Sequence, residues 1–317
     1  MVFRDSDTSV LISCETGVYG TRVTPAKDVG LVQNITMTER NTLEKVNVVG
    51  ARNASTLSAG KYDATGSIET IFQHGRLLAY AVGTVAHSNS STPDILHTFA
   101  EADNLSSFSL QNGHSGSASV GMEYYGCKVN QLTIALEQGG QLTQRAEILA
   151  KTSSNNAVAT AVSISSLTTL PAWSAELKEG GTTVAKVRTF EWTINNNLIP
   201  TGACGSRTIQ QAVEGNRDYT MRVSLAFENR TQYSNFLGGN YPSTGNPTAN
   251  AYVLNCSRGT LATDWRQLYI STSNCLYESA STPVTYGGVT YQDFDVIGLS
   301  GTTGNVYTYD NLTSATW

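Results

Sequence analysis

Several stretches of this chain alternate apolar and polar residues with the period of two that is typical of half-buried β-strands. The clearest stretch is 188–194, in which Phe190, Trp192 and Ile194 lie on one face and the intervening residues are polar. Residues 32–40 form its counterpart in the first half. A second alternating stretch, 220–228, corresponds to 65–72. The pattern predicts paired strands with one buried and one wet face.

Shorter signals complete each half. A helix is predicted over 73–82 and another over 230–237, and each ends at a glycine, Gly83 or Gly238, as helix C-termini prefer. Strands are predicted over 128–137 and 141–150, joined by a turn at 139–140, with looser equivalents at 267–270 and 291–298. Residues 151–169 read as a linker plus a strand. The fold class is therefore mainly β.

The same landmarks recur in both halves at a constant spacing, because 205 − 50 and 238 − 83 both equal 155. The first set is Gly50, Arg52, Gly60, Asp63, Thr65, Ile68, Phe72 and Gly83, and the second is Gly205, Arg207, Gly215, Asp218, Thr220, Val223, Phe227 and Gly238. A repeat this long is too large for a solenoid unit. It predicts an internal duplication, with one β domain over 1–155 and another over 156–317.

A long polar connection separates the first two strands of each half, over 41–62 and 195–217. Connections of this length are too long for tight hairpins and usually carry a function. Their apolar residues favour burial in a partner, which makes them candidates for contacts between subunits; the alternative is a disordered surface loop. The candidate residues are Val48, Val49, Leu198, Ile199, Ile209 and Val213.

The composition disfavours several classes of function. Charged residues make up only 14% of the chain and the net charge is −5. Without a block of Lys and Arg, a protein that grips nucleic acid through its phosphates is disfavoured. The five cysteines are scattered, which disfavours a zinc site and a disulfide framework and fits synthesis in a reducing compartment. The N-terminus does not resemble a signal peptide, and no apolar run reaches membrane-spanning length.

Catalytic motifs are weak. The histidines, His74, His87, His97 and His114, lack the spacing of metal ligands, and the Ser/Thr/Pro-rich stretch around His87 and His97 predicts a loop. The run 113–117 lacks the final glycine of a nucleophile elbow. Asp293 and Asp295 share a strand face without an acid or base partner in view. We therefore expect no catalytic residue, no cofactor and no metal, and the chain is not predicted to be an enzyme.

Specific runs resemble a known family. They are 190–200 with Gly205-Ser-Arg207, 214–217, 225–228 and 236–238 in the second half, and 60–69, 75–80, 126–133 and 137–140 in the first. Together they are similar to the tail tube proteins of tailed bacteriophages and archaeal tailed viruses. The resemblance implies two tandem β-sandwich or barrel units, each with a short flanking helix. It further implies inner sheets that join around a ring, and rings that stack into a hollow tube for genome delivery.

The resemblance also implies partners for this chain. Family members with one unit form hexameric rings, so a chain with two units would need three copies for a pseudo-sixfold ring. The other expected partners are tape-measure, tail terminator and baseplate proteins, while viral DNA passes through without specific binding. The protein is then expected in the virion tail, after assembly in the host cytoplasm.

A conduit for DNA needs a lining that does not retain phosphates. The polar strand faces offer Ser, Thr and carboxylates, with Arg222 as an exception that a neighbouring carboxylate would pair. The candidate lumen-facing residues are Glu69, Glu137, Glu191 and Glu228. The alternative is that these faces are simply the wet side of a sandwich.

A second function from another class is a two-domain β-sandwich adhesin or tail-tip protein that binds a cell-surface glycan. Such proteins expose aromatic clusters on loops. Near the C-terminus this chain has Tyr286, Tyr291, Tyr307, Tyr309 and Trp317. Their placement on strands or on loops bears on this alternative.

Overall fold

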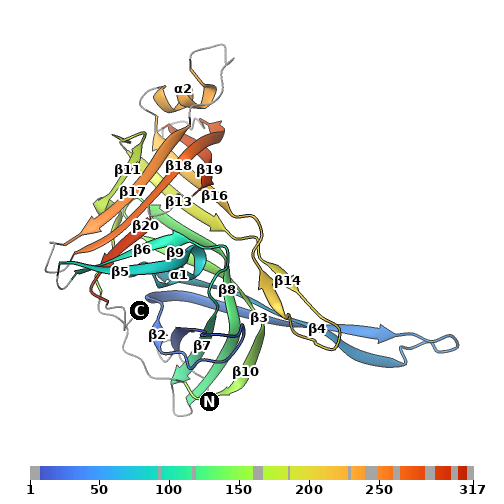
Figure 1. Cartoon of the computed structure of the whole chain (residues 1–317). Coiled ribbons are helices and arrows are strands. Elements are labelled where there is room, and N and C mark those ends of the chain that lie inside the picture. Colours follow the sequence, from blue (N-terminus) through green and yellow to red (C-terminus); the bar gives the residue numbers. More distant parts are fainter. Residues whose placement is uncertain are drawn as a thin grey trace.

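The computed structural model describes residues 8–91, 94–115, 119–159, 167–184, 186–227, 230–239, 249–259, 265–282, 290–300 and 306–312. It is a mainly β body from which one long two-stranded arm projects (Figure 1). The two halves of the chain occupy opposite ends of the body, and strands of one half pair with strands of the other.

One continuous antiparallel sheet runs through both halves, and we call it the shared sheet. Its strand order is β3-β4-β9-β8-β13-β16-β19-β18. The bounds are β3 Leu31–Val46, β4 Thr56–Ile71, β9 Thr143–Ala150, β8 Ser119–Glu137, β13 Val187–Asn195, β16 Asp218–Ala226, β19 Tyr291–Ser300 and β18 Arg266–Ser281. The pairing of β8 with β13 joins the two halves.

A second layer covers the apolar face of the shared sheet. In the first half its order is β2-β1-β7-β8-β10, and the rest runs β12-β11-β17-β18-β20-β6-β5. The bounds are β1 Thr8–Cys14, β2 Lys27–Asp28, β5 Gly83–Ser91, β6 Asp94–Glu101, β7 Phe108–Ser115, β10 Thr152–Ala157, β11 Ala175–Glu179, β12 Thr182–Thr183, β17 Asn250–Arg258 and β20 Val306–Asp310. Strands β8 and β18 belong to both layers. Each contains a residue with positive φ, Gly126 (62°) or Asn274 (53°), between its two sets of partners.

A single hydrophobic core lies between the layers and draws on both halves. Trp192 on β13 is fully buried and donates its indole N–H to Thr272 Oγ1 on β18, 3.2 Å away. Ile134 on β8, directly opposite Trp192 in the sheet, is also fully buried. Alternation in the sequence therefore predicted the buried face correctly, because every second side chain of a strand points into the sandwich.

Two α-helices interrupt the strands: α1 spans Arg76–Val82 and α2 spans Thr231–Leu237. Both lie within the predicted segments, and both end at the predicted glycines, Gly83 and Gly238. A short 3-10 helix, η2, spans Ala172–Ser174 and precedes β11. Helix α1 is largely buried, whereas α2 buries none of its residues.

The two halves repeat one succession of pairings. Ile35 faces Ile68 across β3–β4, and Phe190 faces Val223 across β13–β16, each residue 155 positions after its counterpart. The helices also coincide at this spacing, since 76 + 155 is 231 and 82 + 155 is 237. The division into domains 1–155 and 156–317 stays a prediction, because the halves share both layers.

The two long connections are not open loops. The first continues the β3–β4 ladder as far as Val46 and Thr56, which forms the projecting arm (Figure 1). The second forms a hairpin of β14 (Ile199–Thr201) and β15 (Gln211–Val213). We refer to residues 41–62 as the first hairpin and to 196–217 as the second hairpin. Neither is a tight hairpin, as predicted, because the ladders end at Val46 and Thr56 in the first and at Thr201 and Gln211 in the second. The sequence did not predict the strand pairing itself, because strands with two exposed faces carry no apolar alternation.

Buried polar contacts tie the halves together. Lys128 on β8 forms an ion pair with Glu214 of the second hairpin at 2.6 Å, and both side chains are nearly buried. Asn196 donates to the carbonyl oxygens of Ala81 and Val129 at 3.0 and 3.1 Å. Buried charges and amides of this kind need partners, so each contact holds the second hairpin in one position.

The outer layer has its own joint between the halves. His97 on β6 lies 2.8 Å from Asp310 on β20, and both side chains are buried. His87 on β5 lies opposite His97 in the ladder. The prediction of a loop around these histidines was therefore wrong: they lie on paired strands and connect the first half to the last described strand.

The Lys128–Glu214 ion pair should make the free energy of unfolding depend on pH. Burial would raise the pKa of Glu214, but the hydrogen bonds from Lys128 and the Leu105 amide outweigh it and leave the pKa below its ordinary 4.5. A lowered carboxyl pKa stabilises the folded state above about pH 4.5, and this stabilisation is lost as pH falls through the folded value. Glu214→Gln should lower the free energy of unfolding by about 2 kcal/mol at pH 7.

Urea unfolding at pH 7 and pH 3.5 measures this effect. The difference between the wild type and Glu214→Gln should shrink at the lower pH, whereas exposed Glu137→Gln should change little at either. An equal difference at both values would show that the charge of Glu214 does not stabilise the joint.

Candidate functional site

The outward side of the shared sheet carries polar side chains from both halves, and we call it the polar face. It consists of the rows of paired residues that run through every second position of β8, namely Gln131, Thr133, Ala135 and Glu137. One row connects Glu69, Arg145, Thr133, Thr193 and Thr220 across five strands. The opposite side of the same strands faces the core. The pairing register between β8 and β13 is unbroken, so the polar face continues from one half of the chain to the other.

The polar face is predominantly acidic. Its carboxylates come from Glu69, Glu137, Glu147, Glu191, Asp218, Asp293 and Asp295, against guanidinium groups from Arg145 and Arg222. Threonine, serine and amide side chains fill most of the positions between them, and Ala135 and Ile297 are apolar residues on the same face. A hollow of about 650 Å³ lies on this face over β8, β13, β16 and β19. Such a face repels phosphates.

Arg222 is the cation near the middle of this surface. Its Nε donates to Asp295 Oδ1 at 2.9 Å, which confirms the predicted pairing with a neighbouring carboxylate. Ser279 also donates to Asp295, at 2.7 Å. The Ser279 hydrogen bond, with the contribution of Arg222, holds the pKa of Asp295 below its ordinary value. The carboxylate therefore stays charged and neutralises the arginine.

The structure brings together three of the four candidate lumen residues. Glu69 on β4, Glu137 at the end of β8 and Glu191 on β13 all point to the polar face, in different rows. Glu228 lies outside the described residues. Whether the face lines a channel stays a prediction, because a single chain does not show what it encloses.

Both ends of the shared sheet are open within the described part of the chain. At one end β3 pairs with β4 alone, and at the other the last residues of β18, from 276 to 281, pair with β19 alone. Unpaired strand edges expose backbone donors and acceptors that favour pairing with another chain.

The six hairpin candidates fall into different environments. Val48 and Val49 are exposed at the tip of the arm, and Ile199 and Val213 are exposed in the second hairpin. Leu198 is partly buried. Ile209 is only 1% exposed within its own chain, so it does not enter an exposed contact surface. The tip of an exposed hairpin gives no periodic signal, and its surroundings decide which residues are covered.

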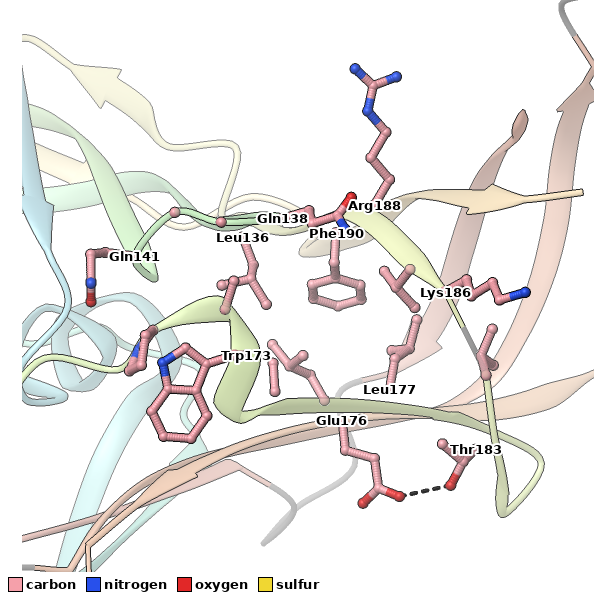
Figure 2. A pocket seen from close by; sticks show the side chains of 18 residues that line it. Leu136, Gln138, Gln141, Trp173, Glu176, Leu177, Thr183, Lys186, Arg188 and Phe190 are labelled. Carbon is pink, nitrogen blue, oxygen red and sulfur yellow. Dashed lines mark hydrogen bonds between the residues drawn. The ribbon is translucent and has the colours of Figure 1, made fainter. Parts of the chain in front are cut away.

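A separate pocket of about 510 Å³ opens at the end of the sandwich, beside the turn between β8 and β9. Figure 2 shows Leu136, Phe190 and Leu177 in its apolar wall. At the rim the Thr183 hydroxyl donates a hydrogen bond to the Glu176 carboxylate. No group of three or more potential metal ligands occurs among the described residues. No helix within the described ranges is long and apolar enough to cross a membrane.

The C-terminal aromatic residues are part of the sheets. Tyr291 is on β19, and Tyr307 and Tyr309 are on β20, where Tyr307 stacks on Tyr269 with ring centroids 4.5 Å apart. Tyr286 and Trp317 lie outside the described residues. Where described, these aromatics are strand residues rather than a cluster on loops.

These features define a two-layered β-sandwich protein with an acidic outward face, a projecting hairpin and sheet edges that are open within the described residues. The chain belongs to the phage tail tube protein family, whose family model matches residues 5–297. It is thus a structural tail tube protein, a component of the virion tail that assembles with other tail proteins. A search of curated proteins found no matching relative.

Substitutions on the two sides of β13 should separate core from surface. Trp192→Ala should lower the free energy of unfolding by about 3–5 kcal/mol, because it removes a fully buried ring. The adjacent Glu191→Ala should stay within about 0.5 kcal/mol of the wild type. Chemical denaturation checks both; a large loss at Glu191 would show that this carboxylate stabilises the fold rather than covering a free face.

Proposed function

We propose that this chain assembles into trimeric rings that stack into the hollow tail tube and line the path of genome delivery. The observation that carries the proposal is the shared sheet, which is continuous through both halves yet open at both ends. An open sheet that joins end to end with further copies closes into a ring and leaves no edge.

The internal repeat suggests how copies join. Gln131 on β8 pairs with Asn195 on β13 within the chain. Ser279 is the counterpart of Gln131 because their successive pairings coincide. Gln131 faces Glu147, which faces Ser67, and Ser279 faces Asp295, which faces Arg222, 155 positions after Ser67. Arg40 is the counterpart of Asn195, 155 positions earlier. Pairing of β18 with β3 of the next copy, with Ser279 opposite Arg40, would repeat the internal joint.

Three copies give six repeats of this joint, which is the pseudo-sixfold ring expected from a duplicated chain. The polar face then lies on the inside, where its carboxylates keep the phosphates of DNA from binding. The protein supplies a passive channel and no enzymatic step. The arm extends beyond the body and is available to an adjacent ring, and tape-measure, terminator and baseplate proteins would meet the tube during assembly or at its ends.

Electron microscopy of the purified protein at rising concentration, together with light scattering, tests the assembly. We expect rings of threefold mass that stack into hollow tubes. A protein that stays monomeric at every concentration, both alone and with preformed tube ends as an initiator, would contradict the proposal.

Charge reversal tests the lining. Tubes of Glu137→Lys/Glu191→Lys should bind duplex DNA and release it as salt rises, because lysines in the channel attract phosphates. The matched control is Asp103→Lys/Glu176→Lys, which changes the net charge by the same amount away from the polar face. Cosedimentation of tubes with short duplexes measures binding. Equal binding by both variants would place the polar face outside the channel.

A further inference from the structure

The first and second hairpins are built alike, although their surroundings differ. Leu43 faces Ala59 in the first hairpin, and Ile199 faces Val213 in the second. These pairs share one register, because 43 + 59 is 102 and 199 + 213 is 412, and the difference is twice 155. The tip turns also match, with bonds from Ala51 N to Val48 O and from Ser206 N to Ala203 O.

Both tips turn through a glycine with positive φ, Gly50 at 91° and Gly205 at 88°. Such a backbone conformation strongly favours glycine. Each glycine is followed two positions later by an arginine, Arg52 or Arg207. The repeated Gly-x-Arg thus places an arginine at the same point of each hairpin tip.

In the second hairpin this arginine makes a defined contact. Arg207 donates from Nε to the Gly60 carbonyl oxygen at 2.9 Å and from Nη2 to Asn41 Oδ1 at 2.7 Å. Its own carbonyl oxygen accepts from the Tyr62 amide at 2.8 Å. The tip of the second hairpin therefore binds the base of the first, as Figure 1 shows for β14 beside the arm.

The first hairpin has no such partner within the described residues. Arg52 is exposed, and Leu57 is 64% exposed although its counterpart, Ala212, is fully buried. An arginine and an apolar side chain are thus placed as in the second hairpin but left in water. The receiving base also recurs: Gly215 and Arg217 are the counterparts of Gly60 and Tyr62.

We propose that the first hairpin of each copy binds the second hairpin of the neighbouring copy in the same way. Arg52 Nε donates to the Gly215 carbonyl oxygen of the neighbour, and the neighbour's Arg217 amide donates to the Arg52 carbonyl oxygen. Asn196 Oδ1 already accepts from Arg217 at 2.9 Å, so the contact to Asn41 is not repeated. This inference rests on the proposed ring. It specifies which residues of the two hairpins join neighbouring copies within that ring.

Helix α2 provides independent support for the same occupant. Within the chain, Asn196 donates to the Ala81 carbonyl oxygen in the last turn of α1. The counterparts are Asn41 and Phe236, and the carbonyl groups of a last helical turn need such partners. Near α2, Phe227 and Tyr233 are 44% and 40% exposed, and no residue of α2 is buried. A neighbouring copy placed by the repeat would bring Asn41 to this uncovered helix.

The repeat also separates two contact surfaces on the arm. Ala203 and Cys204, the counterparts of Val48 and Val49, remain exposed in the second hairpin. Val48 and Val49 therefore stay uncovered when Arg52 binds the neighbour, and they remain available to an adjacent ring. Leu57 and Arg52 act within a ring, whereas the tip valines act between rings.

Thiol cross-linking tests the proposed contact. The background carries Cys14→Ser and Cys204→Ser, because these two cysteines are exposed and the other three are buried. Ala51→Cys with Asn216→Cys places thiols on both sides of the contact between copies and leaves Arg52 in place. The internal equivalent, Lys61→Cys with Ser206→Cys, is the matched control. A short bismaleimide should link the first variant into covalent species of up to three chains and the control within one chain.

Arg52→Ala provides a second measurement. It should raise the protein concentration needed for ring formation by roughly tenfold or more, because it removes a charge-assisted hydrogen bond. Its thermal unfolding as a monomer should match the wild type, whereas Arg207→Ala should unfold earlier. Rings that form normally in Arg52→Ala, with no link between copies through residues 51 and 216, would overturn this contact but leave the tube intact. Absence of rings in the wild type would overturn both.

Discussion

The pairing of β8 with β13 is the interaction on which the rest of the structure depends. It joins strands of the two halves into one sheet with a common core. A sheet extended in this way keeps an unpaired edge at each end, and natural proteins pair or cover such edges. In the proposed ring, each open edge pairs with an edge of the next copy, so that no edge stays exposed.

The pairing of β8 with β13 also determines which side chains lie on the polar face. Because side chains alternate along each strand, the register that buries Trp192 also places Glu191 on the outward side. Carboxylates from both halves therefore gather on one face without any specific contact between them. Arg222 does not disturb this surface, because Asp295 neutralises it within the sheet. An acidic surface suits a passage through which a polyanion must move without binding.

The two hairpins show how one sequence pattern serves two environments. The second hairpin is held by Lys128, Asn196 and Arg207 against the first half of its own chain. The first hairpin has the same register and the same tip turn, but it projects from the body (Figure 1). In the proposed ring, one of the two hairpins is bound within its own chain, and the other is bound by the next copy.

The alternating strands, the helix ends and the repeated spacing could be read from the sequence, because they depend on local alternation, on terminal glycines and on constant offsets. The alternation of Phe190, Trp192 and Ile194 with polar residues determined a buried face before any partner was known. What it could not show was the partner. The pairing of β8 with β13, the buried contact of His97 with Asp310 and the burial of Ile209 join residues far apart in the chain. The arm was likewise hidden, because a strand exposed on both faces has no apolar period. Local pattern decided which face of an alternating strand is buried, and only the tertiary structure decided what covers it and which hairpin residues are buried as well.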